Sequence, residues 1–301
     1  MNCPLCKNKE TRKIDVLVKR DLTELYNKFT ANDFDYLIDR NITYFECQRC
    51  KLRYYDPPIT GDEKFYNALQ KFEWYYLDEK DEYAEAAKYI RSSDKVLDVG
   101  SGKGSFAKCI STKDFIGLDS SAHARDMATK VGVVVLDETI QNFAKQHEEQ
   151  FDVVTSFQVL EHVLEPDKFL EAKIKALKVG GKMIVAVPSE SSFLTHVTNG
   201  ILNMPPHHVT RWSDETLVYI ADQYKLKLLK IQHEEMQNVH KLWYIHTFIQ
   251  NSMLRAKLVD TSLVRKITSD ISNIIARILV RGAKKEFLPH GHTVMAIYGK
   301  K

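Results

Sequence analysis

The sequence has no uninterrupted apolar run that approaches the ~20 residues needed to span a bilayer. Its opening stretch, MNCPLCKNKE, is polar and lacks the apolar core of a signal peptide, so no secretory signal is expected. Charge of one sign is also scarce, because 43 basic and 40 acidic residues leave a net charge of +3. These absences predict a cytoplasmic protein and argue against a mainly electrostatic nucleic-acid binder.

Cysteine is scarce too, with five in 301 residues, but four of the five are paired in the sequence. They form two C-x-x-C units, Cys3/Cys6 and Cys47/Cys50, and Cys109 stands alone. In a reducing compartment such units indicate a Cys₄ zinc site rather than disulfides. The 40 residues between the units exceed the usual ribbon spacing, so an insertion has to loop out. Four thiolates leave no open coordination position, so the expected Zn²⁺ is structural.

The pattern of breakers and apolar runs predicts three parts. The boundary YYDPPITGDE is rich in turn residues, and the stretch after it has a helical pattern. This stretch carries Trp74, Tyr75 and Tyr76, which are expected either to form a lid over the site or to pack in the core. From residue 95 short β-branched strands alternate with helix-like segments, which predicts an α/β, doubly wound, seven-stranded Rossmann-like sheet. The expected parts are a zinc-ribbon domain (1–58), a helical connector or lid (59–93) and the sheet domain (94–301) with a helical insertion at 234–290 before the last strand.

The stretch VLDVGSGKGSF, residues 96–106, is a glycine turn between a strand and a helix. It is no P-loop, because Leu97 stands five before Gly102 and Gly104 stands where Ser or Thr is needed. A dinucleotide fingerprint is weakened, because the third glycine comes one residue early. What remains is a close approach of the backbone to a ligand, with carboxylates at Asp98 before the turn and Asp119 after the next strand. An acid at Asp119 can accept the ribose hydroxyls of a nucleoside.

Residues 94–190 resemble the class I S-adenosylmethionine (SAM)-dependent methyltransferases. Five motifs in order carry the resemblance: VLDVGSGKGSF, GLDSS, LDETIQNF, FDVVTSFQVLEHVLEP and LKVGGKMIVAVPS. The resemblance implies that Asp98 holds the methionine ammonium, directly or through water. It places the other cofactor contacts at Gly100, Gly102, Gly104, Asp119, Ser120, Thr139, Ile140 and Phe157. The stretch CQRCKLRYYDPP also resembles the zinc-ribbon end before many bacterial small-molecule and glycan methyltransferases, with Lys51 in place of the usual glycine.

The acceptor side is expected in the long loop after the fifth strand, since ligands bind beyond the carboxyl ends of such strands. This loop contains PPHHVTRWS, which resembles a P-x-H-x-x-x-[WF]-[ST] stretch of related enzymes, so His208, and after it His207, is the expected general base. The alternative is that these histidines only hydrogen-bond the loop. His162 is taken as scaffold. No N/D-P-P-Y/F signature and no acidic metal cluster follow the fourth strand, which favours metal-independent displacement.

The expected function is methyl transfer to a hydroxyl or carbon of a small molecule, sugar or glycan, as in glycan biosynthesis. The rivals are a zinc-ribbon RNA methyltransferase, disfavoured by the small net charge, and a non-catalytic SAM-binding or assembly module. Within the insertion, residues 263–285 combine helically spaced Leu and Ile with Lys and Arg. This helix is expected to pack on the sheet or a second subunit, or to contact an anionic membrane face as a peripheral protein does.

Overall fold

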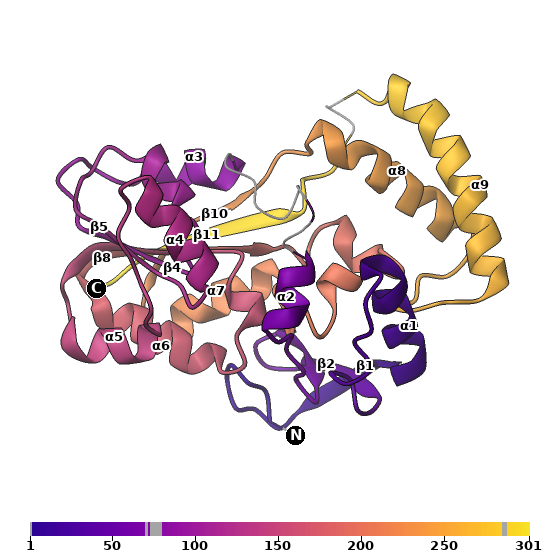
Figure 1. Ribbon diagram of the computed structural model, residues 1–301, viewed down its shortest axis with the longest axis horizontal. Helices are drawn as coiled ribbons and strands as arrows, with labels where there is room; N and C mark the ends of the chain where they lie inside the picture. The colour runs from indigo at the N-terminus through magenta and orange to yellow at the C-terminus, as the bar shows by residue number, and fades with distance from the viewer. Residues whose placement is uncertain (1, 70–71, 73–79, 285–287) are drawn as a thin grey trace.

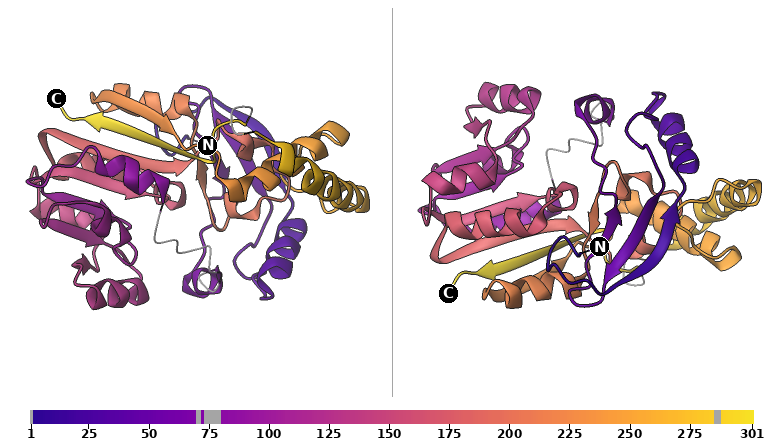
Figure 2. Two further views of the ribbon diagram at one scale, coloured as in Figure 1. Left: turned by 90° about the horizontal axis from the view of Figure 1, so that it is seen from above. Right: turned by 90° about the horizontal axis from the view of Figure 1, so that it is seen from below.

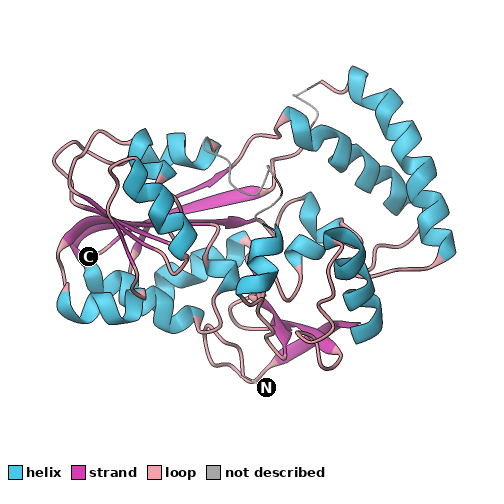
Figure 3. Cartoon of the chain, in the orientation of Figure 1, coloured by secondary structure: helices cyan, strands magenta, loops and turns pink. Residues whose placement is uncertain are grey.

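The computed structural model describes residues 2–69, 72, 80–284 and 288–301. The aromatic lid expected at Trp74, Tyr75 and Tyr76 lies outside the described residues. Figure 1 shows a body built around one large sheet, a smaller sheet near the N-terminus and a helical arm that extends away from both. Figure 3 shows the same arrangement by secondary structure.

The large sheet contains the seven strands that the sequence predicts. Its order is β10-β11-β8-β7-β4-β5-β6, and β11 alone runs antiparallel to its neighbours among the described strands. The central strands β4, β7 and β8 are mostly apolar on both faces, as suits a sheet covered on both sides, whereas the edge strand β10 is largely polar. The seven strands are β4 (Val96–Val99), β5 (Phe115–Leu118), β6 (Val135–Leu136), β7 (Phe151–Phe157), β8 (Leu177–Pro188), β10 (Lys227–His233) and β11 (Thr293–Gly299).

Helices cover both faces of this sheet, which confirms the doubly wound α/β fold (Figure 1). Aromatic residues of α3 (Asp81–Ala87) and the short η1 (Ser105–Cys109) pack on one face. The opposite face is covered by α5 (Ile140–Gln146), α6 (Pro166–Ala176) and α7 (Asp214–Gln223). The crossover between β5 and β6 is α4 (Ala122–Lys130), which Ser121 caps by accepting a hydrogen bond from the Ala124 amide.

The smaller sheet joins the N-terminal segment to the loop after β8. It has the order β1-β2-β3-β9, and its last strand, β9 (Thr210–Arg211), comes from that loop, where Thr210 pairs with Tyr54. The other strands are β1 (Thr11–Leu17), β2 (Ile42–Cys47) and β3 (Arg53–Asp56), with α1 (Lys19–Thr30) between β1 and β2 and α2 (Glu63–Leu69) after β3. The described N-terminal residues, 2–58, therefore share a sheet, and a continuous apolar core, with the chain that follows them.

The helical insertion forms an arm of two packed helices. They are α8 (Asn238–Met253) and α9 (Leu263–Leu279), and the arm points away from the sheet (Figures 1 and 2). The described part of the chain contains no helix with the length and apolar character that crossing a membrane requires.

A buried ion network fastens the loop after β8 to the smaller sheet. Glu190, whose side chain is 3% exposed, pairs with Arg211 at 2.6 Å and with Arg53 of β3. Arg53 also donates to Glu46 of β2 at 3.0 Å, and the Arg211 guanidinium lies over the ring of Tyr44, 5.4 Å from its centroid. A carboxylate in this position is compensated only while both arginines stay in place, so the network holds the loop in one conformation.

Candidate functional site

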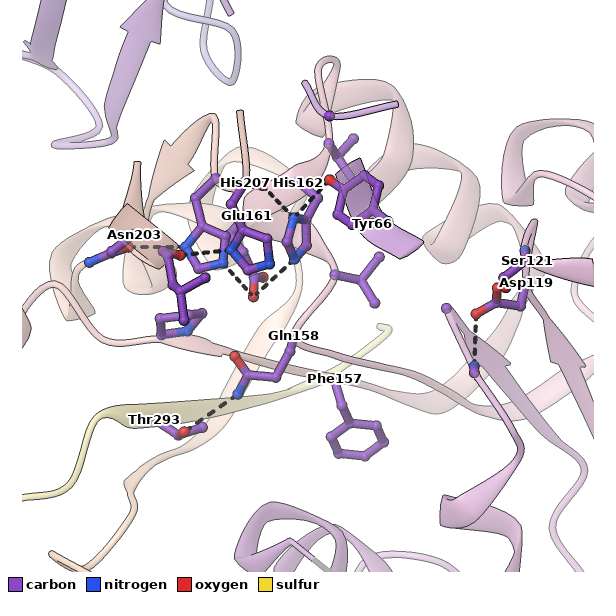
Figure 4. A pocket seen from close by; sticks show the side chains of 18 of the residues that line it. Tyr66, Asp119, Ser121, Phe157, Gln158, Glu161, His162, Asn203, His207 and Thr293 are labelled. Atoms are coloured by element: carbon purple, nitrogen blue, oxygen red, sulfur yellow. Dashed lines mark hydrogen bonds and ion pairs between the residues drawn. The ribbon is translucent and has the colours of Figure 1, made fainter. Parts of the chain in front are cut away.

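One cavity of about 2230 Å³ opens at the carboxyl ends of the parallel strands. Its wall includes the glycine turn after β4, the end of β7, the loop after β8 and the start of α8. Figure 4 shows Asp119 and Ser121 at one side of this space and the histidines at the other, with Phe157 and Gln158 between them. Segments far apart in the sequence thus share one ligand-sized space, as expected at this edge of a doubly wound sheet.

The glycine turn has the conformation that its residues predict. Gly100, Gly102 and Gly104 have φ values of +74°, +55° and +74°, a region that side chains with a Cβ adopt at a cost. A Cβ on Gly100 would also lie 2.3 Å from a methyl group of Val159. The turn is fixed by Asp119, which accepts hydrogen bonds from the backbone amides of Gly102 and Ser121, both at 2.8 Å.

Seven of the nine residues expected at a cofactor form part of the cavity wall: Gly100, Gly102, Asp119, Ser120, Thr139, Ile140 and Phe157. The described wall does not include Asp98 or Gly104. Gly104 is packed instead on Val133, which a Cβ would approach to 2.7 Å. Thr139 caps α5 by accepting from the Asn142 amide, so its hydroxyl is already engaged.

Asp98 is buried beneath the turn and is not part of the described cavity wall, so its expected contact with a ligand ammonium, directly or through water, stays a prediction. Asp98 is 2% exposed and accepts a 2.6 Å hydrogen bond from Thr155 of β7. Burial raises the pKa of Asp98 to about 6, although Thr155 opposes the shift. The hydrogen bond from Thr155 thus links the carboxyl group of Asp98, near the end of β4, to the neighbouring strand β7.

At the other side of the cavity three histidines surround Glu161 (Figure 4). One nitrogen each from His162, His207 and His208 lie within 4.8 Å of one another. Glu161 Oε1 is 3.9 Å from both His162 Nε2 and His208 Nε2. The Glu161 side chain is 1% exposed, and neither of its oxygens has a hydrogen-bond partner among the described residues. The sequence analysis missed Glu161 and treated His162 as scaffold; the signal was their adjacency, E-H, at the end of the fourth parallel strand.

Hydrogen bonds to the backbone and to Asn203 assign the tautomers of this cluster. His162 Nδ1 donates to the carbonyl of His207 at 2.6 Å, and His207 Nδ1 donates to the carbonyl of Leu202 at 2.8 Å. The Asn203 amide oxygen accepts from Arg211 at 3.1 and 3.3 Å, so its nitrogen donates to His208 Nδ1 at 3.1 Å. The proton of His208 is therefore on Nε2, toward Glu161, whereas His162 and His207 carry a lone pair on Nε2.

The charges of the cluster are set by burial. It lowers the pKa of His162 to about 4 and that of His207 to about 3, and the pKa of His208 also falls well below its usual value. Burial likewise raises the pKa of Glu161 to about 8. At neutral pH the three imidazoles are thus uncharged. The carboxyl group of Glu161 loses its proton at a higher pH than an exposed glutamate does.

Two further clusters have the composition of metal sites. The sulfurs of Cys3, Cys6, Cys47 and Cys50 lie within 4.8 Å of one another, with Cys3–Cys50 and Cys6–Cys47 distances of 3.5 Å. The second cluster joins Glu234, His240 and His292 in the cavity wall. The sequence analysis missed this cluster, because its members come from three separate segments and H-G-H before the last strand was the only hint.

Comparisons with known proteins agree with the fold and the cavity. A family model described as "Methyltransferase domain" matches residues 71–231. The ubiquinone biosynthesis O-methyltransferase of Pectobacterium atrosepticum is 33% identical over 146 residues, which cover 40% of this chain and 61% of that protein. The enzyme of the same name from Klebsiella pneumoniae is 30% identical over 167 residues, 49% of this chain and 69% of that protein. The match to the first relative thus leaves more than a third of its length uncovered.

Two solved structures share the fold. A SAM-dependent methyltransferase from Archaeoglobus fulgidus superimposes with a TM-score of 0.51 at 20% identity and covers 79% of this chain and 100% of its own. A SAM-dependent methyltransferase from Thermotoga maritima, described as a possible histamine N-methyltransferase, gives the same score and identity over 79% of this chain and 98% of its own. Since the family match spans more than half of its 301 residues, the chain belongs to the methyltransferase-domain family and has the fold of the SAM-dependent methyltransferases.

Proposed function

We propose that the chain transfers a methyl group from SAM to a hydroxyl group of a small molecule. The observation that carries this proposal is the single cavity that joins the glycine turn and Asp119 to the histidines around Glu161. The name of the two relatives, O-methyltransferase, favours oxygen over carbon as the methylated atom. A sugar or glycan hydroxyl fits the same chemistry. The identity of the acceptor molecule depends on which compound the histidine side of the cavity binds.

The cofactor half of the wall suits SAM, which supplies a methyl group on a sulfonium when bound. Asp119 presents carboxylate oxygens for the ribose hydroxyls, and the left-handed glycines let the backbone approach the ligand closely. Ile140 and Phe157 supply apolar surface for the adenine and the methionine chain. The residues of this chain thus bind and orient the donor, and the reaction needs the acceptor oxygen aligned with the methyl carbon.

The first prediction concerns the cofactor. Asp119→Ala removes the acceptor of the ribose hydroxyls and should weaken SAM binding by about 1.5–3 kcal/mol, the value of hydrogen bonds to a charged group. Calorimetric titration of SAM measures the change. Asp126→Ala, on the exposed face of α4, is the matched control and should bind as the wild type does. Equal affinity of the Asp119 variant and the wild type would remove the basis of the cofactor assignment.

For the proton of the acceptor hydroxyl we propose a histidine of the loop after β8 as the general base. The sequence favours His208 before His207, and the hydrogen bonds support a division of labour between them. His207 carries its lone pair on Nε2, whereas His208 keeps a proton on Nε2 toward Glu161. We therefore assign proton acceptance to His207 and orientation of the cluster to His208. The displacement itself uses no metal.

The second prediction separates the two histidines. His207→Ala should lower turnover by the ~10²–10⁴ of a lost general base with little change in SAM affinity. His208→Ala should lower turnover less. His147→Ala should leave turnover unchanged, because His147 is stacked against Phe143 outside the described cavity wall.

The base is active when unprotonated, so activity should be lost only as pH falls through the lowered pKa of His207, about 3, and not near 6.5. Methylation of a panel of phenolic and sugar hydroxyls over pH 4–8 is the assay. An acid limb near pH 6.5, or full turnover in both alanine variants, would contradict the assignment.

We also propose that the four cysteines bind one structural Zn²⁺. Sulfurs 2.3 Å from a tetrahedral zinc lie about 3.8 Å apart, close to the 3.5 Å distances between Cys3 and Cys50 and between Cys6 and Cys47. Lys7 and Lys51, which directly follow the two C-x-x-C units, have φ values of +57° and +60°. Lys51 thus adopts the left-handed conformation for which glycine is usual at this position, so the turn after the second C-x-x-C unit forms despite the lysine.

The third prediction concerns this zinc. Protein purified under reducing conditions should contain zinc, and Cys47→Ser should lose one equivalent and lower the melting temperature, because a structural zinc contributes folding free energy. Elemental analysis and thermal unfolding measure both effects. Cys109→Ser, which changes the remaining cysteine, should keep the full zinc content. Zinc-free wild-type protein would refute the site.

Finally, we propose that the arm rests on an anionic membrane surface. One side of α9 exposes Leu263, Ile274 and Ile278, which are 70%, 63% and 69% accessible. Lys266, Arg277 and Arg281 belong to the same segment, in which Asp270 is the one acidic residue from 263 to 284. An apolar stripe bordered by cations has the pattern of a helix that lies in a lipid headgroup region.

The fourth prediction tests the arm. The protein should sediment with vesicles rich in phosphatidylglycerol and less with phosphatidylcholine vesicles, and the double variant Ile274→Glu/Ile278→Glu should abolish sedimentation. Val179→Glu is the matched control, because Val179 is similarly exposed and lies near the start of β8, away from the arm. This variant should sediment with the vesicles as the wild type does. A concentration-dependent dimer that the double variant dissolves, without vesicle binding, would assign the face to a second copy and overturn the proposal.

A further inference from the structure

A second polar cluster lies in the cavity wall at the point where the helical arm leaves the sheet. Glu234 directly follows β10, His240 lies in the first turn of α8, and His292 directly precedes β11. Because β10 runs parallel to the central strands and β11 runs antiparallel to it, both sheet residues lie at the ligand-binding edge. A carboxylate oxygen and one nitrogen from each ring lie within 4.8 Å of one another, and all three residues line the cavity.

The backbone holds this cluster in place. The Glu234 amide donates to the Thr293 carbonyl at 2.9 Å, and the Thr293 amide donates to Glu234 Oε2 at 3.1 Å. The Gly291 amide donates to the Glu234 carbonyl at 2.7 Å. A Cβ at Gly291 would lie 2.7 Å from Glu234 Oε2, so this glycine leaves the space that the carboxylate occupies. The carboxylate is therefore fixed at the cavity wall.

One ring nitrogen of each histidine, Nδ1, has no hydrogen-bond partner among the described residues, and both of these nitrogens are buried. His292 Nδ1 forms an ion pair with Glu234 Oε2 at 3.0 Å, whereas no partner is recorded for His240 Nδ1 among the described residues. Buried nitrogens in such a position call for an explanation, and a bound ion is one of the few available. Two ligands about 2.1 Å from one ion lie about 3.0 Å apart at the right angles of octahedral coordination and about 3.4 Å apart at tetrahedral angles, so the separation of this pair fits the former.

We propose that Glu234, His240 and His292 bind a divalent first-row transition-metal ion. Two imidazoles and one carboxylate are a donor set that such ions prefer, and three protein ligands leave coordination positions open. These positions face the cavity, so an oxygen of the acceptor can complete the coordination shell. The ion then serves as a template that positions the acceptor, and the methyl displacement does not pass through it. This role of the ion rests on the proposed function, whereas binding of the ion does not.

The position of the site in the cavity supports this role. Gln158 directly follows Phe157, which is expected beside the methionine chain, and its side-chain amide donates to Thr293 Oγ1 at 3.4 Å (Figure 4). Thr293 is the neighbour of His292 in the sequence. The ion site therefore lies against the end of β7 on the acceptor side of the expected methyl donor. An acceptor held there would lie between the ion and the cofactor half of the wall.

Titration with Co²⁺ tests the site without SAM or acceptor, on full-length protein whose cysteine site is filled with zinc. Calorimetry should show one equivalent of Co²⁺ binding, and the spectrum should lack the near-ultraviolet charge-transfer band of cobalt–thiolate bonds. His292→Ala and His240→Ala should each weaken binding at least 10-fold. Glu234→Gln, which keeps the shape of the side chain, provides a second variant if the histidine variants unfold. His290→Ala, in the same loop but outside the cluster, should bind Co²⁺ as the wild type does.

Three results would overturn the site. One is wild-type protein that binds no Co²⁺ beyond its zinc. Another is equal loss of binding in the His290 variant. The third is binding that survives His292→Ala but disappears in His162→Ala, which would assign the ion to the histidines around Glu161. The titration contains no SAM, so it is independent of the cofactor assignment. A protein that binds Co²⁺ but not SAM would contradict the proposed function and leave this inference standing. A protein that binds SAM but no Co²⁺ beyond its zinc would contradict this inference and leave the proposed function standing.

Discussion

The buried pairing of Glu190 with Arg211 and Arg53 is the interaction on which the acceptor side depends. Glu190 lies just after β8, Arg211 lies at the far end of the same loop, and Arg53 belongs to the smaller sheet. A carboxylate taken out of water costs several kcal/mol unless nearby charges compensate it, so the loop is held in the arrangement in which Glu190 is paired with both arginines. That arrangement places His207 and His208 at the cavity. Arg211 also donates to the amide oxygen of Asn203, and the amide nitrogen of Asn203 donates to His208 Nδ1, which sets the tautomer of His208.

This arrangement explains why the N-terminal segment belongs to the site although it contributes little of the cavity wall. The smaller sheet supplies Arg53 on β3 and takes in β9 from the loop, and the apolar core around its cysteines continues into that of the large sheet. The cofactor side is built differently. The residues proposed to contact the cofactor lie at strand ends and in left-handed glycines, which the parallel sheet positions without help from the smaller sheet. One half of the cavity is therefore fixed by the parallel sheet, and the other half by the loop after β8 and the smaller sheet.

The same division separates what the sequence could predict from what it could not. The seven strands, the glycine turn and the cysteine pairs depend on local periodicity and spacing, and the strands and the turn have the structure that these patterns predict. The pairing of Tyr54 with Thr210 joins residues more than 150 positions apart and has no local signal. Burial is equally invisible, so no pattern in the sequence indicates that Asp98 lies beneath the turn and is only 2% exposed. Glu161 and Glu234 were missed because an acidic residue next to a histidine is common, and only the fold shows which ones lack partners or share a cavity.

The central claim is that one cavity binds the methyl donor beside Asp119 and presents it to the histidines around Glu161. The most direct measurement is a crystal structure of the protein with S-adenosylhomocysteine, the product form of the donor. The account predicts the ribose at Asp119, the adenine against Ile140 and the sulfur directed past Phe157 toward the histidine side of the cavity. A ligand bound elsewhere, or one whose sulfur points away from the histidines, would contradict it.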